Sequence, residues 1–523
     1  MFFRLKSSTI TGVEASIIEI EVDLKRGLPA YSIVGLPDPA IKEAKERVSA
    51  AIRNSGYDFP LGALTVNLAP AELKKTGSVF DLAMALGILI VSGTLESDCD
   101  FSNYLFVGEL SLDGYVRPVR GILAILQKAH ACGIGHIVLP EANMREASLY
   151  PRGRLHPVRF LHDAVEVIAH PQETNAADSR QRYKQLQDNK GGCDRFPCDY
   201  SDVRGQAYAV RAVLLAAAGN HNILLIGSPG AGKTMIASRI PTILPEMTEE
   251  ESIETTKIYS IAGLLDAGKG LIRNRPFRAP HHTASDVAII GGGRNPIPGE
   301  ITLSHNGVLF LDEFSEFRSN IIQSLRQPLE SGFVVVARAD SRVRFPSRFM
   351  LAAAMNPCPC GYLFDPERTC RCTPRAINHY FMKISGPVLD RIDIQVEVKP
   401  LRPREILEGK PVETSVRMRK QVKHARDIQI RRQGVLNADL PVRKTEKLCG
   451  SDSDTANLLY KAVDRFKLSA RSYYKILRVA RTVADLDERE RIGKEDVLEA
   501  LSYREVESII YAEERKDGVG APG

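Results

Sequence analysis

A short run of glycines and small residues holds the strongest chemical signal in this sequence. The apolar stretch NILLI leads into an octet that precedes the helix-like stretch MIASRIPTIL; the octet is Gly227, Ser228, Pro229, Gly230, Ala231, Gly232, Lys233 and Thr234. Glycines let backbone amides turn inward around phosphates, and the following helix adds a positive dipole. A lysine at this spacing reaches the β- and γ-phosphates, and the next hydroxyl binds Mg²⁺. The octet therefore predicts an ATP–Mg²⁺ site at Lys233 and Thr234.

Two further apolar stretches end in polar side chains that suit the same chemistry. GVLFLDEF would place Asp312 and Glu313 at the carboxyl edge of a parallel sheet, beside the phosphate-binding loop. We expect Asp312 to hold Mg²⁺ and Glu313 to polarise the attacking water. The stretch RFMLAAAMNP would bring Asn356 to the same edge, where its amide can orient that water. Together these residues predict ATP hydrolysis.

A cysteine cluster follows this third stretch. Cys358 and Cys360 form one C-x-C pair, and Cys370 and Cys372 form another. Four thiolates can satisfy a tetrahedral Zn²⁺, so we expect a structural zinc; the alternatives are reduced loop cysteines or an oxidisable pair. His281-His282 does not suggest a second metal, because adjacent histidines in a strand point to opposite sides. Structural packing is the expectation for this pair.

Composition sets the scale of the molecule. The 523 residues carry a formal charge of +6 and are 44% hydrophobic, which excludes wholesale disorder and suggests about three domains at about 150 residues each. Nine cysteines are too few for a secreted disulfide scaffold, and no signal segment begins the chain. The most apolar run, Leu82–Val91, is too short to span a bilayer and predicts a buried helix. These features predict a cytoplasmic protein.

The order of apolar patterns predicts an α/β protein built in parts. Short strands alternate with helices after Val203, which indicates βαβ units and a mainly parallel sheet with helices on both faces. The expected parts are an α+β domain at 1–170, a polar linker at 171–199, an ATPase core at 200–400, an α-helical lid at 401–512 and a tail at 513–523.

The motifs GSPGAGKT, GVLFLDEF, AAAMNPCPCG and SGPVLDRIDI together resemble those of the magnesium-chelatase-like clade of AAA+ ATPases, and most closely the ComM/YifB proteins. The resemblance covers nearly the whole chain. It implies that Asn356 is sensor 1, Arg391 the arginine finger that reaches a neighbouring subunit's ATP, and Arg471 the sensor 2 arginine of the lid. It also implies a homohexamer. Arg478 and Arg481 lie on the same expected helix as Arg471, so they are alternatives for sensor 2.

Members of this clade carry two inserts that line the pore of the ring. The first would cover about 258–306, and the second is a hairpin, FVVVARADSRVRFP, predicted by β-branched alternation around an Asp-Ser turn. The expected DNA contacts are Lys269, Arg338, Arg342 and Arg344. Solvated side chains are the other interpretation of these cations. The competing DNA surface is 401–450, with 13 Lys and Arg against 6 Asp and Glu.

The first 170 residues resemble the proteolytic domain of Lon, through KKTGSVFDLAMALGIL and VGELSLDGYVRPVRGILAILQKAHACGIGHIVLP. The family's catalytic serine position falls on Val79 and its lysine position on Leu123, and neither side chain can act as nucleophile or base. Ser78 is one residue away, and Lys74 and Lys75 are not at the base position. We expect the fold without the peptidase.

Three functions are compatible with these motifs. The ComM resemblance implies an ATP-driven hexameric motor on single-stranded and branched DNA, a helicase that migrates branches during recombination of incoming DNA in natural transformation. Recombination proteins would then be partners. The alternatives are a Lon-like ATP-dependent unfoldase or protein remodeller without peptidase activity, and a magnesium-chelatase-type ATPase subunit.

Overall fold

A computed structural model describes residues 1–36, 38–73, 75, 77–96, 100–170, 196–265, 270–293, 296–338, 341–384, 386–402, 412–449, 453–466 and 469–504. Most of the expected linker and all of the expected tail lie outside these residues. None of the helices within them is both long and apolar enough to cross a membrane.

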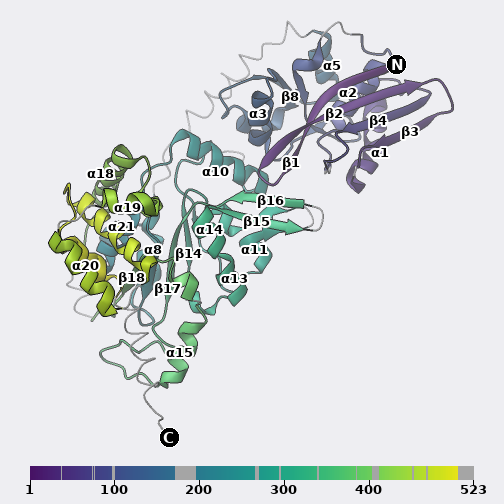
Figure 1. Ribbon diagram of the computed structural model, residues 1–523. Coiled ribbons are helices and arrows are strands. Elements are labelled where there is room, and N and C mark those ends of the chain that lie inside the picture. Colours follow the sequence, from purple (N-terminus) through teal and green to yellow (C-terminus); the bar gives the residue numbers. More distant parts are fainter. Residues whose placement is uncertain are drawn as a thin grey trace.

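An α+β unit occupies the N-terminal part (Figure 1). Its larger sheet has the order β1 (Phe2–Thr11), β2 (Glu14–Lys25), β4 (Ala63–Ala69), β3 (Ala30–Val34). Along β2 the buried Ile18, Ile20 and Val22 alternate with acidic residues, so one sheet face is apolar. The helices α1 (Pro39–Asn54) and α2 (Asp81–Val91) share that face's core, and α2 is buried throughout, as predicted from its apolar run.

A second, smaller parallel sheet completes this unit. Its order is β5 (Tyr104–Phe106), β8 (His136–Pro140), β9 (Arg154–Val158), and its neighbours are β6 (Glu109–Leu110), β7 (Val116–Arg117), α3 (Ile122–Ala131), α4 (Met144–Ala147) and α5 (Leu161–Ala169). Residues of α3 and α4 pack with β8 and β9 in one apolar cluster.

A five-stranded sheet of parallel strands forms the centre of the molecule. Its order is β11 (Phe277–Arg278), β14 (Val308–Leu311), β17 (Met350–Met355), β10 (Ile223–Ile226), β18 (Ile394–Glu397). The strands β10, β14 and β17 are buried along their whole length, as parallel strands covered on both faces must be.

Alternate residues of these strands face two different cores. One core joins Ile223 and Leu225 to helices α7 (Ala207–Gly219), α8 (Lys233–Ser238) and α9 (Ile240–Ile243). The other joins Leu224 and Ile226 to the helices α13 (Ser319–Ser324) and α15 (Pro374–Met382). Helices therefore cover both faces of the sheet, which confirms the predicted α/β class.

In the C-terminal part, the described residues from 412 onward form helices and their connections, on the α7 side of the sheet (Figure 1). They are α18 (Ser415–Gln433), α19 (Val442–Leu448), α20 (Ser453–Phe466), α21 (Ala470–Leu486) and α22 (Lys494–Ser502). The buried guanidinium of Arg426 on α18 donates to the Ala217 carbonyl at the end of α7, at 2.9 and 2.6 Å. Polar contacts as well as apolar packing thus hold this part to the core.

The expected hairpin is present, and it contacts the N-terminal unit. It consists of β15 (Phe333–Arg338) and β16 (Ser341–Pro346), preceded by α14 (Arg326–Ser331). Val343 and Phe345 share an apolar cluster with Val13 of the β1–β2 turn and with Ile258 of α10 (Glu249–Ala262). Beside it, the Gly121 amide donates to the Ser260 hydroxyl at 2.9 Å. The inserts of the central unit therefore form the contact with the N-terminal unit (Figure 1).

Between β11 and β14 the first expected insert adds short elements. These are α11 (Asp286–Ile290), β12 (Gly291–Gly292), β13 (Ile297–Pro298) and α12 (Glu300–Leu303). After the cysteine loop, α16 (Gly386–Leu389) leads into β18.

Candidate functional site

The phosphate-binding loop joins β10 to α8, as the octet predicted. A Cβ on Gly227 would lie 2.2 Å from the Val398 carbonyl oxygen, so only glycine allows the strand to pass this close. The loop ends at Gly232, with φ +94°, and α8 begins at Lys233. The amides at the start of this helix therefore face the loop, in the arrangement that binds phosphate.

The side chain of Lys233, the first residue of α8, reaches back to the loop. Its ammonium donates to the Gly227 and Ser228 carbonyls at 2.6 and 3.1 Å, and to the Asn356 amide oxygen at 3.0 Å. Burial lowers the pKa of Lys233, while the charges of Asp312 and Glu313 oppose that shift. Phosphate oxygens would compete with these neutral oxygens for the same ammonium.

Asp312 and Thr234 meet at the same edge of the sheet. The Thr234 hydroxyl donates to Oδ2 of Asp312 at 2.6 Å, although 78 residues separate them in the chain. Asp312 directly follows β14, and its other carboxylate oxygen accepts from the Glu313 amide at 2.9 Å. A hydroxyl beside a carboxylate is an oxygen pair suited to Mg²⁺.

Glu313 is held by a residue that the sequence did not single out for this role. It has left-handed backbone geometry (φ +51°), and its carboxylate lies 3.0 Å from Nδ1 of His282. His281 and His282 lie in a turn after β11, with ring centroids 4.2 Å apart. The expected strand geometry is therefore wrong for this pair, and the turn places His282 on the carboxylate expected to activate water.

Arg391 and Arg471 share one carboxylate away from this edge. Both guanidinium groups pair with Oε1 of Glu330 on α14; the Arg471 contact is 2.6 Å. Arg391 is 7% exposed and also donates to the Pro387 carbonyl. The pairing lowers the pKa of Glu330, with the hydrogen bond from Arg471 as the largest cause. Sequence patterns gave no signal for Glu330, because the contact joins three distant segments.

Strand register places this arginine pair opposite the phosphate-binding loop. Ile223 pairs with Ile394 and Ile226 with Glu397, so β10 and β18 run in the same direction. The loop follows the carboxyl ends of these strands, whereas Arg391 precedes the amino end of β18. Four residues of strand span about 10 Å, so the two sites lie at opposite edges of the sheet.

Only part of the predicted DNA set falls within the described residues. Lys269 lies outside them, and so does the side chain of Arg338, although its backbone pairs with Ser341. Arg342 and Arg344 are both exposed on β16. The Arg344 guanidinium lies 3.6 Å from the centroid of the Phe333 ring, a cation–π contact that keeps it beside the hairpin.

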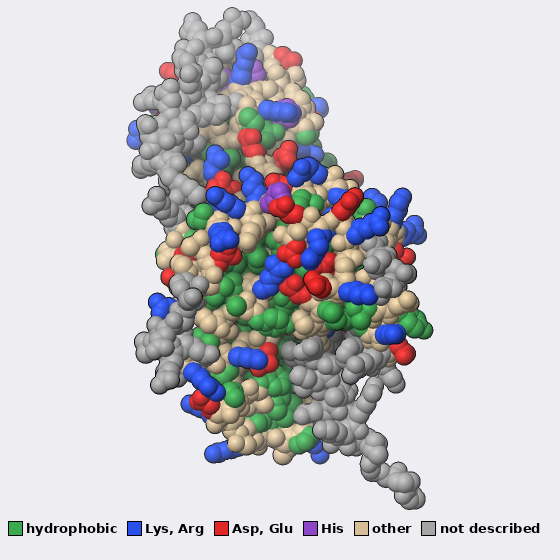
Figure 2. Space-filling model, turned by 90° about the vertical axis from the view of Figure 1, so that its left-hand side faces the viewer, with side chains coloured by type: hydrophobic (Ala, Val, Ile, Leu, Met, Phe, Trp, Pro, Cys, Tyr) green, Lys and Arg blue, Asp and Glu red, His purple; other side chains and the backbone are tan. Residues whose placement is uncertain are grey.

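Basic side chains of α18 are largely engaged within the chain. Arg417 pairs with Glu413 at 2.8 Å, Arg419 donates to the Thr242 carbonyl at 2.8 Å, and Arg432 pairs with Asp485 at 2.5 Å. Figure 2 shows acidic and basic side chains interleaved on the face that the C-terminal helices form. This face therefore lacks a continuous basic surface among the residues described.

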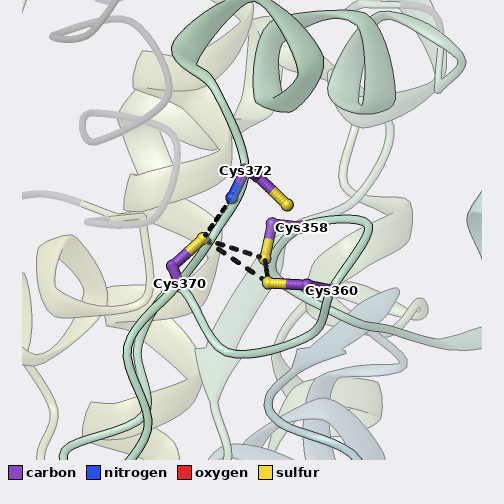
Figure 3. Close-up of side chains that lie close together, drawn as sticks. All are labelled: Cys358, Cys360, Cys370 and Cys372. Carbon is purple, nitrogen blue, oxygen red and sulfur yellow. Dashed lines mark hydrogen bonds between the residues drawn. The ribbon is translucent and has the colours of Figure 1, made fainter.

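The four clustered cysteines converge, as Figure 3 shows. The sulfur of Cys358 lies 3.3 Å from that of Cys360 and 3.7 Å from that of Cys370, and Cys360 and Cys370 are 3.5 Å apart. All four sulfurs lie within 4.8 Å of one another. Backbone amides, chiefly that of Tyr362, lower the pKa of Cys360 to about 6.

The N-terminal unit has apolar side chains at Val79 and Leu123, the positions where the expected resemblance to Lon would place the catalytic dyad. Leu123 on α3 is fully buried, and Val79 packs against two apolar clusters of this unit. The nearby Ser78 hydroxyl pairs with the Glu109 carboxylate, and the buried Lys75 ammonium donates to the Pro70 carbonyl. Lys74 lies outside the described residues.

Comparison with known proteins covers almost the whole chain. Family models match in three places: "Subunit ChlI of Mg-chelatase" at 20–143, "Magnesium chelatase, subunit ChlI" at 199–406 and its "C-terminal" model at 412–504. The chain is 41% identical over 495 residues to Competence protein ComM of Haemophilus influenzae, covering 94% of this chain and 95% of that protein. It is 39% identical over 507 residues to YifB of Escherichia coli, covering 95% and 96%.

A more distant relative matches a smaller share of the chain. The magnesium-chelatase 38 kDa subunit of Rhodobacter capsulatus is 24% identical over 343 residues, which is 61% of this chain and 91% of that subunit. The family model matched at 199–406 spans the whole parallel sheet and its phosphate-binding loop. This chain therefore belongs to the magnesium chelatase ChlI-like family of AAA+ proteins, together with ComM and YifB.

Proposed function

We propose that this chain is an ATP-hydrolysing motor that acts on DNA. Its similarity to Competence protein ComM suggests that the motor serves the recombination of incoming DNA in natural transformation. The observation that supports hydrolysis is the meeting of Lys233, Thr234, Asp312, Glu313 and Asn356 at one edge of the sheet. ComM similarity over 94% of the chain supports the choice of DNA. Such a motor works in the cytoplasm.

Each residue at this edge has a distinct task in hydrolysis. Lys233 binds the β- and γ-phosphates, and Thr234 and Asp312 hold Mg²⁺, which neutralises phosphate charge when bound. Glu313 accepts a proton from the attacking water, and Asn356 orients that water at the γ-phosphate. His282 keeps the Glu313 carboxylate in reach of the site.

The arginine pair supports assembly into a ring, which we propose to be a homohexamer. Arg391 and Arg471 lie at the opposite sheet edge from their own phosphate-binding loop, where Glu330 holds both. In an oligomer this edge meets the loop of the next subunit, so both arginines act on the neighbour's ATP. Two guanidinium groups there would neutralise charge that develops on the γ-phosphoryl oxygens.

We propose that DNA passes along the hairpin and is bound by Arg338, Arg342 and Arg344, and also by Lys269 of the other insert. Six copies would give a positively charged channel for a phosphate backbone.

The cysteine cluster would hold a structural Zn²⁺. We also propose the expected division into an α+β domain at 1–170, an ATPase core at 200–400 and an α-helical lid at 401–512. The α+β domain would have no peptidase activity.

Two other functions are each supported by one observation. An ATP-driven protein remodeller fits the Lon-like pattern of the first 170 residues, and a chelatase-type ATPase subunit fits the 38 kDa relative. That relative aligns with only 61% of this chain, which favours the DNA motor over the chelatase subunit.

The test is ATP-dependent remodelling of branched DNA. Purified protein is mixed with a labelled forked or four-way DNA substrate, and product strands are followed with ATP, without ATP and with the Glu313→Gln variant. We expect product only with ATP and wild-type protein. Absence of DNA remodelling, together with ATP-dependent unfolding of a labelled protein substrate, would favour the remodeller.

A further inference from the structure

The cysteine cluster lies directly beside the phosphate-binding loop. Gly361, between the two C-x-C pairs, has φ +85°, and a Cβ there would lie 2.6 Å from Cδ and 2.8 Å from Cγ of Pro229. The cysteine loop and the phosphate-binding loop therefore touch without a gap for even one methyl group. The contact requires a glycine at position 361 of the cysteine loop, because the rigid ring of Pro229 in the phosphate-binding loop leaves no room for a side chain.

A second connection runs through the asparagine at the end of β17. Asn356 accepts a hydrogen bond from Lys233 at 3.0 Å, and Cys358 follows it by two residues and is fully buried. The position of Cys358 thus limits where Asn356 can lie.

Sulfur geometry in the cluster fits a metal rather than a disulfide. A tetrahedral Zn²⁺ with Zn–S bonds of 2.3 Å places its sulfurs about 3.8 Å apart. The sulfurs of Cys358, Cys360 and Cys370 are 3.3, 3.5 and 3.7 Å apart, whereas a disulfide bond is about 2.05 Å long. Each cysteine supplies one ligand atom, so the protein alone can fill all four positions.

We infer that zinc bound by Cys358, Cys360, Cys370 and Cys372 braces the phosphate-binding loop, so that zinc binding and nucleotide binding reinforce each other. The four ligands come from two short segments that would otherwise be joined only by a loop. Zinc fixes the segment that carries Asn356 and the Gly361–Pro229 contact. Because linkage is reciprocal, nucleotide should also slow the loss of zinc. This inference rests on the proposed ATP site but not on DNA.

The experiment measures nucleotide affinity as a function of zinc, with no DNA present. Zinc per chain is determined by elemental analysis, and binding of a fluorescent ATP analogue is titrated before chelation, after a zinc-selective chelator and after zinc is added back. We expect about one zinc per chain, an affinity that falls about tenfold on chelation, and recovery with zinc. Bound ATP analogue should also slow transfer of zinc to the chelator.

Two variants separate the metal from the contact. Cys360→Ser should lose zinc and affinity together, while Cys132→Ser, at an exposed cysteine of the N-terminal unit, should lose neither. Gly361→Ala keeps all four ligands but forces the two loops apart, so it should retain zinc and still lose affinity. Circular dichroism confirms that each variant is folded.

The outcomes are distinct. Protein without zinc that does not take up added zinc overturns the metal site. Zinc-free, folded protein with unchanged nucleotide affinity overturns the brace, as does Gly361→Ala with normal affinity. Protein that binds zinc but no ATP analogue under any condition contradicts the proposed ATP site instead.

Discussion

At the scale of single residues, Lys233 and Glu313 separate binding from chemistry. Lys233→Ala removes the ammonium that contacts phosphate, so nucleotide binding should fall below detection. Glu313→Gln leaves every phosphate contact in place and removes only the proton acceptor, so ATP should bind with near-normal affinity while hydrolysis slows at least about 100-fold. Equilibrium binding and single-turnover hydrolysis measure the two effects. Equal loss of ATP binding in both variants would show that the role of Glu313 is misassigned.

Several residues of the site could be predicted because simple rules bring them together. The carboxyl ends of parallel strands meet at one edge, and this rule alone places Asp312 beside Thr234 and Asn356 beside Lys233. His282 and Glu330 could not be predicted in the same way. Their partners are set by a turn and by the packing of separate helices, neither of which leaves a periodic pattern in the sequence.

At the scale of elements, a buried ion pair joins the sheet to the helical part. Asp393 precedes β18 and pairs with Lys475 of α21 at 3.0 Å, and its other oxygen accepts from the Asn222 amide at 3.1 Å. Burial alone would raise the pKa of Asp393, but the charges of Lys475 and His221 outweigh it and hold the pKa well below its ordinary value. The pair therefore favours the folded state while Asp393 is ionised.

Replacing one partner should cost more than replacing both. Asp393→Asn leaves Lys475 buried without its counter-charge, and we expect a loss of about 3 kcal/mol in the free energy of unfolding. The double change with Lys475→Met should recover much of this loss. Denaturant titration of each variant gives the values. Equal destabilisation by the single and double changes would contradict the pairing.

The same pair has a signature in the pH dependence. A carboxylate whose folded pKa is lowered stabilises the protein above its unfolded pKa, which is about 4, and this contribution disappears as the pH falls further. Asp393→Asn should therefore flatten the loss of stability below about pH 4.

At the scale of the whole molecule, the hairpin and the C-terminal helices compete as the DNA surface. Changing Arg342 and Arg344 to Gln should weaken binding of single-stranded DNA and reduce the slope of log affinity against log salt by about one per lost phosphate contact. The matched control neutralises Arg417, Arg419 and Lys420 on α18 in the same way. Fluorescence anisotropy at several salt concentrations measures both. If only the control variant loses DNA binding, DNA lies on the helical face.

Assembly should make two inactive variants complement each other. Arg391→Ala keeps an intact phosphate-binding loop, and Lys233→Ala keeps an intact arginine pair for its neighbour. Some sites in mixed rings then combine an intact phosphate-binding loop from one subunit with an intact arginine pair from its neighbour. ATP hydrolysis should therefore reappear on mixing. Mixtures as inactive as either variant alone would contradict arginine action between subunits.

The chain is proposed to be an ATP-driven motor that acts on DNA, so DNA should stimulate its ATP hydrolysis. The most direct measurement is the steady-state rate of ATP hydrolysis by the full chain, alone and with saturating single-stranded DNA, duplex DNA or an unfolded protein. We predict that DNA raises the rate several-fold, that the unfolded protein does not, and that Glu313→Gln is inactive under all conditions. Turnover that ignores DNA, or that responds only to unfolded protein, would contradict the account.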